Sequence, residues 1–167
     1  MNARTQNAMP HPDYLDKLFA HKNTVDKVFK DVLGLYDINH VAVSQVNENN
    51  EILSFSSTPA LEFNLFSSHL WQFDKTYQPS WYQTGESASW QTLYVPHHYD
   101  ELYYLKQMEH HYPIGRSFAV KFENTHVIYS IASKKDTAQT HDDFINQQAC
   151  FYRIGEYCSK TLLPLFL

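Results

Sequence analysis

The chain has 167 residues, of which 43% are apolar, 19% charged and 16% aromatic, a balance typical of one globular domain with a sizeable core. It contains no run of about 18 apolar residues, which argues against any membrane-spanning helix. The formal net charge is −5 and the basic residues are scattered, so we expect no direct contact with nucleic acid, because phosphate-binding surfaces cluster Lys and Arg.

The first residues are polar. Residues 1–12 carry two prolines and are predicted to form a flexible N-terminal tail, followed by a single domain over residues 13–167. The tail lacks the apolar stretch of a secretory signal. Cys150 and Cys158 lie eight positions apart in what reads as one helix, about 12 Å along its axis, which is too far for a disulfide. Two free thiols favour a reducing compartment, so we expect a cytoplasmic protein.

The first half of the domain begins with helical spacing of apolar residues over 13–33, closed by Gly34 and interrupted near residues 21–24. Residues 40–46 are rich in β-branched side chains. A polar turn and a second such run over 51–56 follow, which predicts a β-hairpin. Pro59 then opens a short helix.

The second half contains another hairpin. We predict a short strand at 91–95, a helix at 99–111, strands at 116–122 and 126–132, and one long helix from Thr140 to Leu162. Hairpins separated by helices indicate an α+β fold: an α/β/α sandwich around a mostly antiparallel sheet of about five strands. Such an architecture is PAS/GAF-like.

An aromatic segment, residues 71–90, contains all three tryptophans of the chain together with two tyrosines, spaced among Gln, Ser and Thr without helical periodicity. Aromatic walls with a few polar groups are typical of small-molecule pockets. They are equally typical of partner-binding surfaces, and of plain core filling. Tyr hydroxyl and Trp N–H groups need partners when buried, which a ligand with a polar head and an apolar tail supplies.

Ten histidines raise the question of a metal site. The pairs His97–His98 and His110–His111 flank one predicted helix, but adjacent side chains point in different directions. There is no HExxH, no CxxC, no nucleophile elbow and no phosphate-binding glycine loop. We therefore predict no catalytic residues, no metal and no cofactor. A metal-dependent enzyme using the His97 and His110 region is the least favoured alternative.

Four short stretches resemble the N-terminal sensor half of LuxR-type transcription regulators. They are the sequences GLYDINHVAVSQV from residue 34, SWQTL from residue 89, HYPIGRSFAV from residue 111 and VIYSIAS from residue 127. The similarity extends over about residues 13–163 in the order of its elements. It implies an α/β/α autoinducer-binding-like domain of the quorum-sensing type that binds an acyl-homoserine-lactone-like signal or another small molecule and dimerises.

The resemblance also implies which residues hold the ligand. Matched by order, the candidate ligand-binding residues are Trp71, Tyr77 and Trp90, with Tyr82 or Trp81 as substitutes. Phe118 and Ser130 from the later hairpin complete the candidate set. The Asp-Pro that follows the tyrosine in the family is replaced by Gln78-Pro79. The family's Asp accepts a hydrogen bond from the signal's amide, so its replacement argues against a homoserine lactone.

These observations predict a ligand-sensing regulatory domain of a bacterial transcription regulator. The ligand would bias a homodimer, formed through the long last helix, or an attached DNA-binding half. Nothing after Leu162 in this sequence can form a helix-turn-helix. The alternative is an interaction module that binds no ligand and whose aromatic residues form an exposed docking patch.

Overall fold

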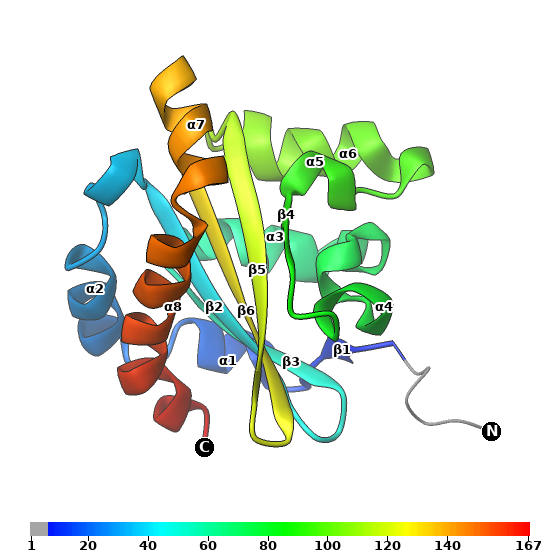
Figure 1. The fold of residues 1–167 in the computed structure, drawn as a ribbon. Helices are drawn as coiled ribbons and strands as arrows, with labels where there is room; N and C mark the ends of the chain where they lie inside the picture. Colours follow the sequence, from blue (N-terminus) through cyan, green and yellow to red (C-terminus); the bar gives the residue numbers. More distant parts are fainter. Residues whose placement is uncertain (1–6) are drawn as a thin grey trace.

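A computed structural model describes residues 7–167 and contains one six-stranded sheet between two helical layers (Figure 1). The strands occur in the order β1-β3-β2-β6-β5-β4. β1 runs parallel to β3, and all other neighbours are antiparallel. Their bounds are β1 Met9–Pro10, β2 His40–Val46, β3 Glu51–Ser56, β4 Ser87–Ser89, β5 Ile114–Phe122 and β6 Thr125–Ser133. The α+β sandwich predicted from the sequence is confirmed, with six strands rather than about five.

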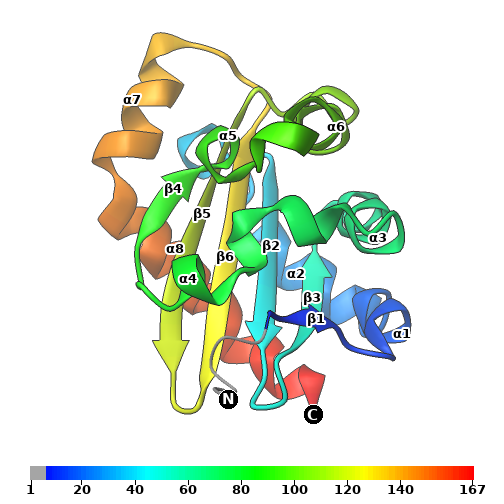
Figure 2. The same ribbon diagram turned by 90° about the vertical axis from the view of Figure 1, so that its right-hand side faces the viewer.

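The helices divide between the two faces of the sheet, as the two views show (Figures 1 and 2). α2 and α8 cover one face, and α3 to α6 cover the other. The α-helices are α1 Tyr14–Leu18, α2 Lys22–Lys30, α3 Pro59–Ser67, α4 Pro79–Tyr82, α5 Trp90–Leu93, α6 Tyr99–Tyr103, α7 Ala138–Asn146 and α8 Gln148–Leu162. The shorter helical turns are η2 Leu35–Asp37, η3 Leu70–Phe73, η4 Lys75–Tyr77, η5 Pro96–His98, the π-helical η6 Tyr104–Met108 and η7 Leu163–Phe166. Within residues 7–167, no helix combines the length and apolar character that crossing a membrane requires.

The first core lies between the sheet and helices α2 and α8. The apolar stripe predicted for the last helix is buried there: Phe144, Phe151, Ile154, Cys158 and Leu162. Alternate residues of the strands meet this stripe, because successive side chains of a strand point to opposite faces. Both cysteines lie in α8 and are free thiols, as the spacing predicted.

The second core lies between the other face of the sheet and helices α3 to α6. It contains Leu61, Leu65 and Phe66 of α3, aromatic residues of the segment 71–90, and Leu102 and Leu105 of the helix that precedes β5. The aromatic segment therefore forms part of the interior on this face.

Two predicted elements differ from the structure. The strand expected at 91–95 is replaced by β4, which ends at Ser89, and by one turn of helix α5; Thr92 donates a hydrogen bond from its hydroxyl to the Ser89 carbonyl at 2.7 Å and holds that turn. The single last helix is two helices that meet at Gln147, and its start is capped by Thr137 instead of Thr140.

The N-terminal boundary also differs. Residues 1–6 of the predicted tail lie outside the described residues. Met9 and Pro10 of the same tail form β1 on the edge of β3, and Ala8 is buried in the second core. The ordered fold thus begins before residue 13. The predicted interruption of the first helix does occur, at His21, whose φ of 54° breaks the helical path.

Candidate functional site

The aromatic segment crosses the second face of the sheet through η3, η4 and α4, and then joins the edge of the sheet as β4 (Figure 2). Tyr77, Tyr82 and Trp90 are 3%, 1% and 0% exposed, while Trp71 and Trp81 are half-buried at the edge of the same core. One proline, Pro79, and two 3-10 turns keep the segment irregular, so its aromatic side chains reach the sheet without forming a helix stripe.

The sheet face beneath this segment is floored by small hydroxyl side chains. Ser44 and Ser54 lie opposite each other on β2 and β3, with their hydroxyl oxygens 2.6 Å apart. Ser117 and Ser130 lie opposite each other on β5 and β6, and both are buried. We call the aromatic segment the cover of this interior and the four serines its floor. Such an interior has more hydrogen-bonding capacity than a plain apolar core.

The structure brings most of the predicted ligand-binding residues together. Trp71, Tyr77, Trp81, Tyr82 and Trp90 belong to the cover, and Ser130 belongs to the floor. Phe118 does not join them. Its ring lies on the opposite face of the sheet, with its centroid 5.8 Å from that of Phe151 and 5.1 Å from that of Tyr152. Because side chains alternate along β5, the residues next to Phe118 face the aromatic segment instead.

A buried ion pair ties the aromatic segment to η6. Lys106 Nζ lies 2.7 Å from Asp74 Oδ2, and the two side chains are 3% and 0% exposed. The other carboxylate oxygen of Asp74 accepts a hydrogen bond from the Thr76 backbone N–H at 3.0 Å. The Lys106 ammonium also lies 4.4 Å from the Trp90 ring centroid, at cation–π distance.

Trp90 lies at the centre of this interior. A side chain on Gly115 would place its Cβ 2.2 Å from the indole ring, so the tryptophan packs directly on the backbone of β5. The indole Nε1 makes no hydrogen bond within the described protein. His40 approaches the same ring edge-on, with the two ring centroids 6.0 Å apart.

A second group of buried polar residues surrounds His40. His40 Nδ1 lies 3.0 Å from the Thr58 hydroxyl, which in turn lies 2.6 Å from the Tyr112 hydroxyl. On the other side of the ring, His40 Nε2 is 3.7 Å from Glu62 Oε2, within ion-pair distance but beyond a hydrogen bond. Glu62 belongs to α3 and is fully buried.

Burial keeps the tyrosines of this interior protonated. It raises the pKa of Tyr77 well above its ordinary value of 10.0, and the nearby carboxylates of Glu62 and Asp74 raise it further. The pKa of Tyr94 is raised in the same way, first by burial and then by Asp74. These hydroxyls are therefore permanent hydrogen-bond donors; that of Tyr94 donates to Gln107 Oε1 at 2.8 Å.

Sequence reasoning missed the buried titratable residues of this site, namely His40, Glu62, Asp74 and Lys106. Glu62 had a simpler explanation in the first turn of a helix, where a carboxylate stabilises the dipole. Lys106 did carry a signal, since it follows Leu105 and lies four positions after Leu102, both buried. A charge on the buried face of a helix needs a partner inside the protein.

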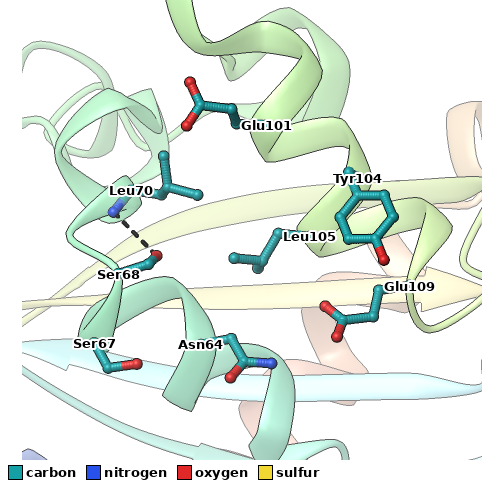
Figure 3. Close-up of a pocket in the computed structure, with 8 residues that line it drawn as sticks. All are labelled: Asn64, Ser67, Ser68, Leu70, Glu101, Tyr104, Leu105 and Glu109. Atoms are coloured by element: carbon teal, nitrogen blue, oxygen red, sulfur yellow. Dashed lines mark hydrogen bonds between the residues drawn. The ribbon is translucent and has the colours of Figure 1, made fainter.

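Two surface grooves lie near this interior. The first, of about 480 Å³, runs between α3 and the α6–η6 helix and contains none of the predicted residues; Glu101, Tyr104 and Glu109 form one wall, and Asn64, Ser67 and Ser68 form the other (Figure 3). The second, of about 500 Å³, is lined by residues 7–9 and by Trp71, Phe73, Tyr77 and their neighbours. Tyr77 belongs both to this second groove and to the buried core.

The histidines proposed for a metal site do not converge. His98 stacks on Phe73 with a centroid distance of 3.7 Å and pairs with Glu101, while His110 lies beside Tyr112. Among the residues that the structure describes, no three His, Cys, Asp or Glu side chains come together in a way that could hold a metal ion.

Comparison with known proteins identifies the fold. No protein-family model and no curated protein sequence matches the chain. Among solved structures, Escherichia coli SdiA is similar with a TM-score of 0.56 and 10% identity over 83% of this chain. SdiA in complex with octanoyl-rac-glycerol is similar with a TM-score of 0.62 and 8% identity over 90% of this chain. The match spans 61% and 62% of those longer chains, so this chain shares its fold with a part of SdiA.

Proposed function

We propose that this chain is the small-molecule-sensing domain of a LuxR-type transcription regulator in the bacterial cytoplasm, and that it acts as a homodimer. The DNA-reading part of such a regulator is not contained in this sequence, and this chain makes no direct contact with DNA. The observation that carries the proposal is the interior described above, in which aromatic side chains cover a sheet face floored by serines.

Similarity of fold supports this function. SdiA is a quorum-sensing regulator of the LuxR type. In one of the two SdiA structures that are similar to this chain, SdiA is in complex with octanoyl-rac-glycerol. The four short stretches of sequence that resemble LuxR-type sensors fall on β2, α5, β5 and β6. The three strands belong to one sheet, and α5 begins at the last tryptophan of the aromatic segment that covers it. The similarity of fold and the short stretches of similar sequence thus support the same class of protein, a LuxR-type sensor. A fold alone does not determine function.

The second groove offers a route for a ligand. Trp71 and Tyr77 line it from the outside, and Tyr77 continues into the core. In this structure, Tyr82 and Trp90 pack closely in the interior. A ligand that enters must therefore displace part of the aromatic segment, and this displacement is the signal that the domain passes on.

The rival function, an exposed aromatic docking patch, is less well supported. The largest aromatic side chains of the segment are turned inward: Tyr82 and Trp90 are among the most buried side chains of the described residues. Trp71, Phe73 and Trp81 are the partly accessible aromatic side chains of the segment. A patch of three half-buried rings is small compared with a stable protein interface of about 800 Å² per partner.

Native mass spectrometry of the full chain, purified after expression in bacteria, tests the proposed function. We expect a bound small molecule, or binding of an added acyl compound such as octanoyl-rac-glycerol. Ser130→Val fills part of the floor and should remove the bound mass, while Ser67→Val, at an exposed position of α3, should leave it. If the wild-type chain carries and accepts no small molecule, the proposed function is wrong.

A further inference from the structure

The first surface groove, between α3 and the α6–η6 helix, contains none of the residues proposed to bind the small molecule. It has a volume of about 480 Å³. Its floor is apolar, formed by Leu70 and Leu105, and Leu105 is directed into the space between the two walls (Figure 3). Two exposed glutamates, Glu101 and Glu109, lie on one wall, and none of the residues that line the groove is basic. We call it the acidic groove.

Neither glutamate forms an ion pair with a lysine or arginine within residues 7–167. The lysines that do form ion pairs in this part of the chain contact Asp26, Asp37 and Asp74. Glu101 Oε1 lies 2.8 Å from His98 Nδ1, and this histidine is a cation only when it is protonated. The groove therefore presents negative charge above an apolar floor, on a chain whose formal net charge is −5.

The π-helical turn η6 brings the two glutamates to the same side of the helix. The Glu109 N–H donates to the Tyr104 carbonyl, five positions earlier, at 2.8 Å, and such a turn inserts one extra residue into a helix. In an uninterrupted α-helix, residues eight positions apart lie about 80° apart around the axis, and the insertion reduces this angle to about 20°. Both glutamates thus border the groove, at positions roughly 10–12 Å apart along the axis. Turns of this kind are rare and recur at functional sites.

We propose that the acidic groove binds an extended segment of a partner protein in which two basic residues flank an apolar one, in the pattern Lys-x-Leu-x-Lys. Alternate side chains of an extended chain point to the same side, and residues four positions apart are separated by about 13 Å. This separation is close to that of Glu101 and Glu109 along their helix. The two ammonium groups pair with the glutamates, and the leucine between them covers Leu70 and Leu105.

The other residues of the groove fit the same partner. Tyr104 is 56% exposed on the wall between the two glutamates, where its ring can cover the methylene stem of a lysine. The side chains of Asn64, Ser67 and Ser68 form the opposite wall. They offer donors and acceptors to the backbone of an extended segment, whose own N–H and C=O groups need partners. An acidic segment would be repelled by both glutamates, and a segment with cations alone would leave the apolar floor uncovered.

Titration of the full chain, followed by its amide NMR chemical shifts at low ionic strength, tests the proposal. The probes are the peptides Lys-Ala-Leu-Ala-Lys and Lys-Lys-Leu-Ala-Ala, both acetylated and amidated, which share composition and charge but differ in spacing. We expect the first peptide to shift the amides of α3 and η6 and to bind at least about threefold more tightly than the second. Glu101→Gln combined with Glu109→Gln should weaken its binding about tenfold, because each exposed ion pair contributes up to a factor of about five.

Glu48→Gln combined with Glu156→Gln is the matched control. It removes the same charge from two exposed positions, one in the β2–β3 turn and one on α8, and should weaken the peptide less than about twofold because distant surface charges are screened. Spermidine, which carries cations but no apolar side chain, should bind more weakly than the first peptide.

Four results would overturn the proposal: no binding of the first peptide, equal binding of the two peptides, equal losses in the two double variants, or spermidine binding as tightly as the first peptide. None of these results concerns a small molecule in the interior, so the sensing function is decided separately by its own test.

Discussion

Lys106 and Asp74 form an ion pair inside the protein, with 2.7 Å between Nζ and Oδ2, and join the π-helical η6 to the aromatic segment. Neither partner reaches solvent, so each depends on the other for its charge to be compensated. The pair also fixes the cation that lies over Trp90. It therefore holds the cover of the candidate site in place.

Replacing Lys106 with Met should lower the free energy of unfolding by about 3–5 kcal/mol, because the Asp74 carboxylate is left buried without a cation. Urea denaturation measures this change. The double variant Asp74→Asn with Lys106→Met should recover part of the loss. Lys22→Met removes a lysine from an exposed pair with Asp26 and should have little effect; equal losses for the two lysines would contradict the buried role.

Two glycines make a second pair of variants. A Cβ on Gly115 would lie 2.2 Å from the Trp90 ring, and one on Gly155 would lie 2.1 Å from the Tyr129 ring on the other face. Each Gly→Ala substitution should destabilise the protein by about 1–3 kcal/mol through overpacking. Only Gly115→Ala should also weaken ligand binding, because only Trp90 belongs to the candidate site. Thermal denaturation and titration with octanoyl-rac-glycerol separate the two effects.

The two thiols should differ in reactivity. Burial raises the pKa of Cys158 from an ordinary value of 9.0 to about 12, while Cys150 is partly accessible. Because the thiolate is the reactive form, a thiol reagent near pH 8 should modify one cysteine per native chain and two per unfolded chain. Rapid labelling of both in the native protein would show that α8 is not packed as described.

The same pKa gives the direction of alkaline destabilisation. The unfolded thiol ionises near 9.0, whereas the folded thiol holds its proton to about 12. The folded state therefore binds more protons above pH 9, and stability falls as the pH rises through this interval. Tyr77 and Tyr94, whose pKa values are also raised, act in the same direction above pH 10. Cys158→Ala should flatten the decline in urea midpoints between pH 8 and pH 11.

Tryptophan fluorescence distinguishes the buried cover from an exposed docking patch. In a chain carrying Trp71→Phe and Trp81→Phe, the remaining Trp90 is fully buried. Its emission should be blue-shifted and resist quenching by acrylamide, whereas Trp71, retained alone, should be quenched more readily. Strong quenching of Trp90 would support the docking alternative.

Local patterns in the sequence determine much of this fold. The hairpins at 40–56 and 114–133 follow from β-branched runs around polar turns, and the stripe from Phe144 to Leu162 predicts one side of the first core. The strand expected at 91–95 failed because Trp90 packs on Gly115, and this tertiary contact overrides the β propensity of the residues that follow.

Local sequence patterns did not predict which residues far apart in the chain form pairs in the core. Asp74 and Lys106 are 32 positions apart, and His40 and Glu62 come from a strand and a helix whose relative placement no local signal defines. Phe118 was assigned to the candidate site, although alternation along β5 turns it to the other face. The aromatic residues of the site could be predicted from the sequence, but its buried polar pairs and the side of β5 on which Phe118 lies could not.

The outermost strands of the sheet are its shortest, with β1 two residues long and β4 three. Pro10 in β1 has no N–H to offer, and α1 packs beside β3 below it. Edge strands that are short or contain proline offer a neighbouring chain few backbone groups for pairing, which disfavours edge-to-edge aggregation. Two copies of this domain should therefore associate through side chains on their helices rather than by extending one continuous sheet.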